Sequence, residues 1–363
     1  MNYNIINILV SIILLGCVKS SHTNPVESDS IYGKISMGKL NLLYSNSVMP
    51  YTMDASWATL RNSDSSITFF ETAMGTLPYY YRYSGTASDP LNKVLLPFKW
   101  DYNGFNNHWP SGCWISNIYK ISTDTLLGFV HREDLYPENQ NTVPRDRYFI
   151  GIARSFDGGS NWKYLGDIMG ITGNLLTTTG GSNIAGVPYL VVGDFLYIYY
   201  DERDQFNSTT ALSVGRAKLA DVINAMRTDH VTTFVKFNNG NWTENAFTGV
   251  GTNIIPNFLP GLSDFHSDAA YCSALGMYLI TVQTGSNSIL YLYQSTDGVN
   301  WKNPIQLDYA PGCMQPYSSF VGFNSEASDD SHIVGSVFYI YIDRKKLSDY
   351  NYDDMYSRKI TIQ

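Results

Sequence analysis

Carboxyl groups stand at the ends of short apolar runs in this chain of 363 residues. Glu133 follows the apolar run 126–130, while Asp54 and Asp268 each precede a run rich in apolar and aromatic residues. Glycoside hydrolysis needs one carboxyl group that stays protonated and a second that stays ionised. Crowding of carboxyl groups meets this need, because it raises the pKa of one of them. We therefore expect Glu133 to be a proton donor and Asp54 or Asp268 to be the base, with turn capping as the alternative role of Asp54.

Aromatic, histidine and further acidic side chains accompany these three carboxyl groups. Aromatic rings offer flat apolar surfaces to a sugar, and polar side chains bind its hydroxyl groups. The side chains expected to bind substrate are His131, Glu71, Trp109, Trp114, Asp201, Glu202, His266 and Tyr317.

Two pairs among these candidates also have structural interpretations. Trp109 and Trp114 can belong to the core instead of stacking on a sugar. Asp201 and Glu202 can form surface ion pairs with Arg203, which contribute little free energy. Both interpretations stay open at the level of the sequence.

Histidine and carboxylate side chains are also metal ligands, and His131, His266 and Asp268 could supply a set of three. The four cysteines show no Cys-x-x-Cys spacing, so a zinc site is not expected. We predict no metal and no cofactor. The three cysteines after residue 17 are expected to be small buried apolar residues, and a Cys272–Cys313 disulfide is the alternative.

The pattern along the chain predicts an all-β protein. Runs of β-branched and aromatic residues are cut by Gly, Asn, Asp and Ser, and the one helix candidate is the segment 219–227. The runs form five groups: 55–61, 66–75, 79–83 and 93–97; 114–121, 125–131, 147–155 and 162–168; 187–192, 195–201, 210–219 and 233–237; 268–274, 277–283, 288–295 and 301–307; 317–323, 337–342 and 357–362. The fifth group has three strands, and the segment 39–44 can supply its fourth.

Five such groups describe a five-bladed β-propeller whose last blade is closed by an N-terminal strand. This closure protects sheet edges that an open repeat would expose. In a propeller, the starts of first strands and the ends of second strands meet at one rim of a central funnel. The fold therefore brings Asp54, Glu133 and Asp268 to one rim. A large β-sandwich is the alternative architecture.

Two segments carry a turn motif before the fourth strand of their groups. Residues 155–162 fit the pattern S-x-D-x-G-x-[TN]-W, and residues 295–301 are a variant one residue shorter. In such a turn the aspartate binds backbone amides and glycine adopts positive φ, so Asp157 and Asp297 are expected to be structural. The segments resemble the Asp boxes of sialidases and other secreted sugar-active propellers.

The five-group count is similar to that of the five-bladed glycoside hydrolases of the family 43 type. This resemblance implies a propeller that acts on carbohydrate. In the family 43 type, the base, the pKa modulator and the acid come from the starts of first strands in three successive groups. Here Asp54 fits the first position, but the segments 111–114 and 186–188 contain no carboxylate. The acid would then come from Glu133 or Glu202.

The first 17 residues differ from the rest. The apolar run 5–15 is too short to cross a bilayer and suits a secretory signal. It leads into Leu14, Leu15, Gly16 and Cys17, which resemble the bacterial lipobox and imply lipidation of Cys17. We expect a signal peptide over 1–17, a polar tether over 18–38 and one propeller domain over 39–363. An ordinary cleaved signal or a buried N-terminal strand is the alternative.

Composition narrows the classes of function. Charged residues make up 15% of the chain and hydrophobic residues 44%, which predicts a large core and excludes general disorder. The net charge of −8 excludes the basic footprint of a nucleic-acid-binding protein.

These features predict a secreted, lipid-anchored bacterial glycoside hydrolase of the cell envelope, monomeric and acting on a glycan at the funnel. Its partners would be a carbohydrate and, through the anchor alone, the membrane. The first alternative is a non-catalytic carbohydrate-binding lipoprotein of a glycan-uptake system. The second is a propeller that binds a protein, in which Asp54, Glu133 and Asp268 would not converge.

Overall fold

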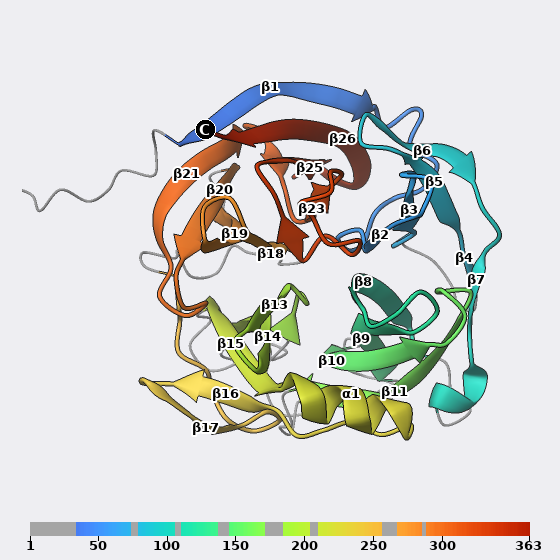
Figure 1. Cartoon of the computed structure of the whole chain (residues 1–363), viewed down its shortest axis with the longest axis vertical. Coiled ribbons are helices and arrows are strands. Elements are labelled where there is room, and N and C mark those ends of the chain that lie inside the picture. Colours follow the sequence, from blue (N-terminus) through green and yellow to red (C-terminus); the bar gives the residue numbers. More distant parts are fainter. Residues whose placement is uncertain are drawn as a thin grey trace, which may run out of the picture.

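The computed structural model describes residues 34–73, 79–105, 110–136, 145–170, 184–203, 210–255, 267–284 and 288–363. Five mostly antiparallel sheets surround a central axis as the blades of a propeller (Figure 1). The predicted five-bladed β-propeller is therefore confirmed. Within the described part of the chain, no helix is long and apolar enough to cross a membrane.

The first blade consists of β2 (Thr59–Arg61), β3 (Ile67–Phe70), β5 (Arg82–Thr86) and β6 (Asp89–Val94). Its last two strands are displaced from the predicted segments 79–83 and 93–97. Two short strands, β4 (Tyr79–Tyr80) and β7 (Phe98–Trp100), instead join the edge of the second blade's sheet. This pairing buries the ring of Phe98 between the two blades, and that apolar burial explains the displacement.

The second blade consists of β8 (Gly112–Lys120), β9 (Leu126–Tyr136), β10 (Arg145–Ser155) and β11 (Asn161–Gly170). β7 pairs in parallel with the start of β11. The short 3₁₀ helix η2 (Tyr102–Phe105) lies beside β11, where the ring of Phe105 stacks on Tyr164. β9 continues past its predicted end at residue 131, so the polar segment 131–134 lies on a strand.

The third blade consists of β12 (Ile184–Ala185), β13 (Tyr189–Val192), β14 (Phe195–Arg203), β15 (Thr210–Lys218), β16 (Val235–Asn238) and β17 (Asn241–Asn245). The helix α1 (Leu219–Arg227) follows β15 and confirms the predicted helix 219–227. Val222 and Met226 on its buried face pack into the core between the second and third blades.

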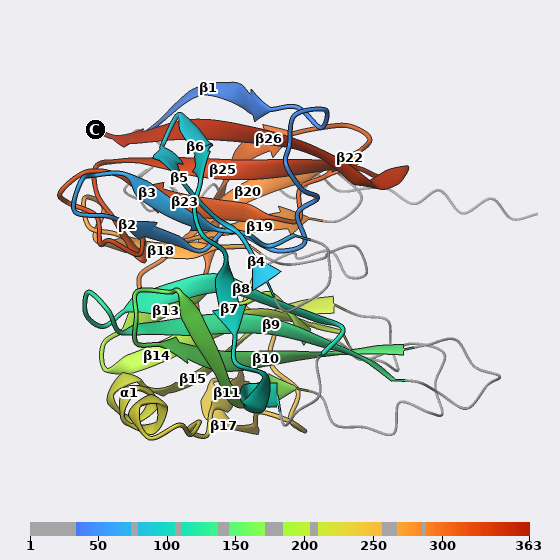
Figure 2. The same cartoon turned by 90° about the vertical axis from the view of Figure 1, so that its right-hand side faces the viewer.

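The fourth blade consists of β18 (Ala269–Cys272), β19 (Met277–Thr284), β20 (Ile289–Ser295) and β21 (Lys302–Tyr309), with the short β24 (Ile333–Val334) at its inner edge. The fifth consists of β22 (Cys313–Met314), β23 (Ser318–Gly322), β25 (Val337–Lys346), β26 (Asp349–Ile362) and β1 (Ile35–Tyr44). β1 pairs antiparallel with β26, which confirms closure by an N-terminal strand (Figure 2). β1 begins at Ile35, four residues earlier than predicted. Cys113, Cys272 and Cys313 are free thiols.

Apolar cores fill the spaces between neighbouring blades, in five separate clusters. Between the fifth and first blades, Trp57 contacts Phe69 and Tyr341 edge to face. Between the first and second blades, Phe70 contacts Phe98 and Trp162. The core therefore follows the ring of blades and leaves the axis to polar side chains.

Two matching turns join the third and fourth strands of the second and fourth blades. Oδ1 of Asp157 and of Asp297 each accepts a hydrogen bond from a serine hydroxyl two residues earlier and from two following backbone amides. In the longer turn, Trp162 Nε1 also donates to the Gly159 carbonyl at 3.1 Å. Both aspartates therefore stabilise turns, as the sequence pattern predicts.

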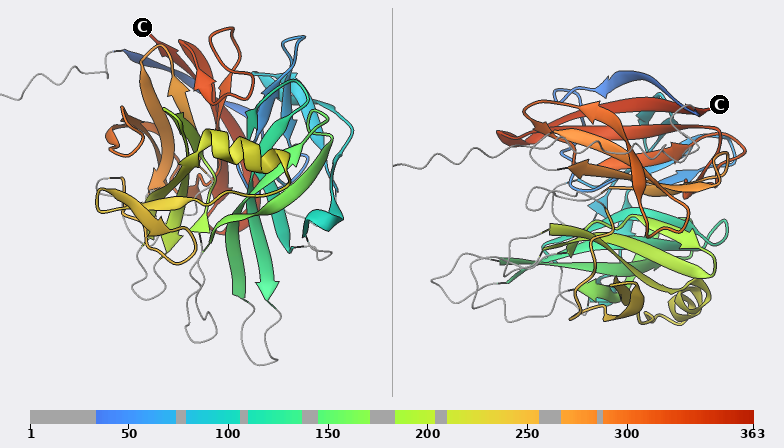
Figure 3. Two further views of the ribbon diagram at one scale, coloured as in Figure 1. Left: turned by 60° about the horizontal axis from the view of Figure 1, so that its bottom comes forward. Right: turned by 90° about the vertical axis from the view of Figure 1, so that its left-hand side faces the viewer.

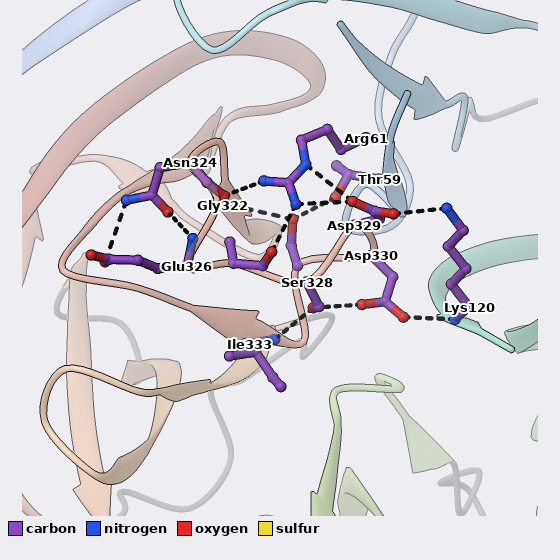
Figure 4. A network of polar contacts seen from close by, with 12 residues as sticks. Thr59, Arg61, Lys120, Gly322, Asn324, Glu326, Ser328, Asp329, Asp330 and Ile333 are labelled. Carbon is purple, nitrogen blue, oxygen red and sulfur yellow. Dashed lines mark hydrogen bonds and ion pairs between the residues drawn. The ribbon is translucent and has the colours of Figure 1, made fainter. Parts of the chain in front are cut away.

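The segment 323–336, named here the cap segment, follows β23 and carries charged residues to two other blades. Asp329 binds Arg61 of the first blade and Lys120 of the second, at 2.9 and 2.8 Å. The backbone amide of Lys120 donates to Asp330 at 2.6 Å (Figure 4). This network joins the fifth blade to the first and second.

The cap segment also reaches the remaining blades through His332. The His332 ring lies 6.0 Å from the ring of Tyr189 in the third blade. Its carbonyl oxygen accepts a hydrogen bond from the amide of Tyr271 in the fourth blade at 2.8 Å. The cap segment therefore contacts an inner strand of each of the other four blades. It crosses one end of the propeller axis.

Candidate active site

Glu133 lies on β9, and alternation along this strand divides the polar segment 131–134 between two faces. On one face, His131 Nε2 lies 3.0 Å from Glu133 Oε1. On the opposite face, Arg132 binds both carboxylate oxygens of Asp167 at 3.0 and 2.9 Å. The segment is therefore two separate pairs of residues, and His131 and Glu133 form the pair that faces the site.

His131 is fully buried between two aromatic rings. Its ring stacks on Trp114 at 5.7 Å and meets Tyr148 edge to face at 5.2 Å. Burial lowers the pKa of His131 to about 3, so the imidazole is neutral at physiological pH. The contact with Glu133 is therefore a hydrogen bond made by a neutral imidazole and not an ion pair. It orients Glu133 without adding a positive charge.

Asp54 enters the same space from the start of the first blade. Its backbone amide donates to the Thr72 carbonyl, and the Tyr317 hydroxyl of the fifth blade donates to Asp54 Oδ1 at 3.0 Å. Burial raises the pKa of Asp54 to about 7, and the negative charge of Glu133 adds to this increase. Asp54 and Glu133, from neighbouring blades, therefore form an electrostatically coupled pair.

A buried charged cluster in the fifth blade supports Asp54 and was not predicted. Lys345 Nζ binds Asp353, lies 3.9 Å from Asp343 Oδ2, and sits 5.4 Å from the ring centre of Tyr317. Asp353 also accepts a hydrogen bond from the Met53 amide at 2.8 Å, one residue before Asp54. The cluster therefore fixes both the backbone and the hydroxyl that position Asp54. The sequence signal was polar residues at alternate positions after the apolar run 337–342.

Glu71 is largely buried near this pair. The backbone amide of Tyr81 donates to Glu71 Oε2, and burial raises the pKa of Glu71. The charges of Asp54, Glu71 and Glu133 all act on the hydroxyl of Tyr80. The three carboxyl groups therefore act electrostatically on one tyrosine. The sequence did not distinguish Tyr80 from its neighbours Tyr79 and Tyr81.

Asp268 has a different environment from Asp54. Its oxygens accept hydrogen bonds from the backbone amides of Ala269 at 2.8 Å and Phe320 at 2.7 Å. The side chain of Asn117 also hydrogen-bonds to it, and burial raises its pKa to about 7. These contacts join the inner strands of the second, fourth and fifth blades. Of the two candidate bases, only Asp54 belongs to the coupled pair with Glu133.

Two further expected site residues are buried among protein atoms. Asp201 accepts a hydrogen bond from the amide of Ala185 at 2.7 Å, within the third blade. Trp114 Nε1 donates to the Ala73 carbonyl at 2.8 Å. Its ring is 3% exposed, so it supports His131 from the core.

Some expected site residues cannot be placed. Trp109, His266 and Cys17 lie outside the described residues, as does the side chain of Glu202, whose backbone pairs with Ile184. No group of three or more potential metal ligands occurs within the described ranges.

The arrangement can transfer protons. One carboxyl group with a pKa near neutrality faces a second one that a neutral imidazole orients, inside a largely buried site. This is the pairing that general acid–base catalysis requires.

Comparison with known proteins identifies the fold. No family model and no curated protein matches the sequence. Among solved structures, a family 117 glycoside hydrolase produced by the marine bacterium Zobellia galactanivorans superposes with a TM-score of 0.50 at 10% identity, covering 90% of each chain. The catalytic domain of a Coprinopsis cinerea GH62 α-L-arabinofuranosidase scores 0.48 at 10% identity, over 91% of this chain and 97% of that one. A Bacillus subtilis arabinanase scores 0.46 at 10% identity, over 89% and 97%.

Proposed function

We propose that this protein is a glycoside hydrolase that acts on a glycan held between the first and second blades. The observation that carries the proposal is the coupled carboxyl pair Asp54 and Glu133, in which one pKa is raised to about 7. Glycoside hydrolysis uses such a pair, with one protonated and one ionised member. The propeller folds of the similar structures are consistent with this chemistry.

The environment of the pair favours an exchange of the two roles expected from the sequence. Asp54 retains its proton to a higher pH, which suits a proton donor. Glu133 accepts a hydrogen bond from His131 when Nε2 carries the proton, which suits an ionised base or nucleophile. We therefore propose Asp54 as the acid and Glu133 as its ionised partner.

The charge of the site restricts the substrate. Asp54, Glu71 and Glu133 offer acceptors for hydroxyl groups, and an ionised uronic acid would be repelled. The proposed substrate is therefore a neutral or cationic glycan.

The decisive experiment compares the full-length protein with Glu133→Gln on a panel of polysaccharides and aryl glycosides, with analysis of the released sugars. Asp134→Asn is the matched control, because Asp134 is the next residue of β9 but binds Arg132 on the opposite face. Release by the parent and by Asp134→Asn, but not by Glu133→Gln, supports the proposal. Equal release by all three would reject Glu133 as a catalytic residue.

A second candidate function is a non-catalytic carbohydrate-binding protein of a glycan-uptake system. The observation that favours it is the inner edge of the second and third blades, where Trp114 and Val187 are buried and no carboxylate stands at the corresponding position. This alternative predicts no sugar release, but a rise in melting temperature with one glycan of the panel.

We also propose that the protein is secreted and held in the bacterial cell envelope by a lipid on Cys17. The predicted tether 18–38 is shortened, because β1 already begins at Ile35, so the proposed tether ends before residue 35 and the propeller domain extends from there to residue 363. The support is the lipobox-like sequence and the two turns that match the Asp-box pattern of secreted propellers. Cys17→Ser should move the protein from the membrane fraction to the soluble fraction. Retention in the membrane fraction would contradict the anchor.

A further inference from the structure

Tyr80 lies on β4, where the first and second blades meet, and its side chain is fixed in one position. Its backbone pairs with Phe98 across β4 and β7, and its ring stacks on that of Phe98 at 5.6 Å. The residue is 2% exposed. It belongs to the same apolar core as Trp114, which stacks on His131. The tyrosine is therefore anchored in the apolar core that supports His131.

The Tyr80 hydroxyl forms no hydrogen bond with any residue that the structure describes. Buried hydroxyl groups are nearly always paired, because an unpaired one loses its hydration without compensation. Other buried tyrosines of this chain follow that rule. Tyr199 donates to the Gly298 carbonyl and Tyr189 to the Ile118 carbonyl, both at 2.7 Å.

The surroundings of this hydroxyl are those of a donor held for a ligand. Burial raises its pKa, and the charges of Cys113, Asp54, Glu71 and Glu133 raise it further, so it keeps its proton. The neighbouring donors are already engaged within the protein. The hydroxyl of Tyr317 binds Asp54, and the indole of Trp114 binds a carbonyl.

We propose that Tyr80 is a substrate-binding residue whose hydroxyl donates a hydrogen bond to an oxygen of a neutral sugar held between Asp54 and Glu133. This inference rests on the proposed glycosidase function. Ionised carboxylates only accept hydrogen bonds, so sugar hydroxyl groups can donate to them but need another partner to fill their own acceptor positions. Tyr80 supplies that partner, and it positions the sugar ring between the proton donor Asp54 and its ionised partner Glu133.

The test is Tyr80→Phe in the full-length protein, which removes the hydroxyl alone. We expect kcat/KM for the glycan released by the parent to fall by about 10- to 100-fold, with an unchanged melting temperature. Tyr199→Phe is the matched control, because it removes a buried hydroxyl that is paired within the protein. It should lower the melting temperature by about 1–3 °C and leave kcat/KM unchanged.

Each result has a distinct meaning. If Tyr80→Phe keeps kcat/KM within about twofold of an active parent, the inference is wrong while the proposed function stands. A fall in melting temperature equal to that of Tyr199→Phe would also overturn it, since the hydroxyl would then be structural. If the parent releases no sugar, the hydrolase proposal fails. The glycan-dependent rise in melting temperature then becomes the readout, and Tyr80→Phe must abolish it. A parent that no glycan stabilises overturns both proposals.

Discussion

A buried or largely buried aspartate lies at each end of the propeller axis, and the pKa values of the two are shifted in opposite directions. β8 connects them, because Gly112 at its start pairs with Glu133 and the amide of Lys120 at its end binds Asp330. Nine strand residues place the two ends about 26 Å apart. At the rim, burial raises the pKa of Asp54. At the cap segment, hydrogen bonds outweigh burial and lower the pKa of Asp330.

The difference lies in the partners and not in the burial. Asp330 is more deeply buried than Asp54, but it accepts hydrogen bonds from His332, Ser328 and the Lys120 amide. Asp54 accepts one from a tyrosine and faces another carboxylate. Paired carboxylates stabilise a fold, whereas unpaired ones cost free energy and persist where they serve chemistry. The cap end is therefore structural, and the rim is the candidate active site (Figure 3 shows the ring of blades that separates them).

The largest expected effect is on catalysis at the rim. Asp54→Asn should lower kcat/KM on glycans by about 10²- to 10⁴-fold, because it removes the proton donor. The loss should be much smaller on aryl glycosides whose leaving groups need no proton. The alkaline limb of the parent's pH–rate profile, expected near pH 7, should disappear. If the pH–rate profile of Asp54→Asn kept the alkaline limb of the parent, the proton donor would be another residue.

The next effect is on stability at the cap end. Asp330→Ala should lower the free energy of unfolding by about 3 kcal/mol, since it leaves buried donors of three residues without an acceptor. Chemical denaturation measures the loss. Activity of the folded variant, measured well below the denaturation midpoint, should stay within about twofold of the parent. A specific loss of activity would mean that the two ends are coupled.

The contributions of Asp54 and Asp330 to the free energy of unfolding should also change with pH in opposite directions. The folded pKa of Asp54 lies above its unfolded value, so its contribution to stability is present below about pH 4 and lost as pH rises through about 7. The folded pKa of Asp330 is lowered, so its contribution is present above the unfolded pKa and lost on acidification. Asp54→Asn should therefore gain about 2 kcal/mol over the parent at pH 8 and little at pH 4.

Denaturation of the parent and both variants at pH 4 and pH 8 measures this contrast. Asp330→Asn should show the reverse order, with a larger loss of stability at pH 8 than at pH 4. If both variants changed in the same direction, the electrostatic contrast between rim and cap segment would be wrong.

The smallest effect is expected for the exposed ion pairs of the cap segment. Asp329 binds Arg61 and Lys120 but is 38% exposed, so water screens these contacts. Asp329→Asn should cost about 1 kcal/mol or less, and the cost should shrink in 1 M salt. A loss as large as that of Asp330→Ala would show that exposure does not distinguish the two aspartates.

Much of the fold follows from local patterns. Runs of β-branched and aromatic residues located most strands, and the helix 219–227 was expected as a short excursion between strands. The strands predicted at 79–83 and 93–97 are displaced in the structure. β4 and β7 pair with each other and with a neighbouring blade, and no local pattern reports which sheet a short aromatic strand joins.

Only some residues of the candidate site could be predicted from the sequence. Polar residues next to apolar strands predicted that Asp54, Glu71, His131 and Glu133 belong to one site, and the sugar-release experiment tests that prediction. Asp268 shared that signal, yet its oxygens bind backbone amides of two strands. Tyr80 gave no signal, and the alternating polar residues at Asp343 and Lys345 did not reveal their role, because both roles depend on contacts with residues distant in the chain.

The sequence by itself determined the number of blades and the turns at Asp157 and Asp297, since these depend on local periodicity or on short-range hydrogen bonds. Closure by an N-terminal strand followed from counting, because the fifth group lacked one strand. Only the tertiary structure decided the chemistry. It buried His131 between two rings so that it is neutral, placed Asp54 against Glu133, and left the Tyr80 hydroxyl unpaired among the described residues. The physical reason is that pKa values and hydrogen-bond pairing depend on burial and on distant partners, which appear only when the five blades close around the axis.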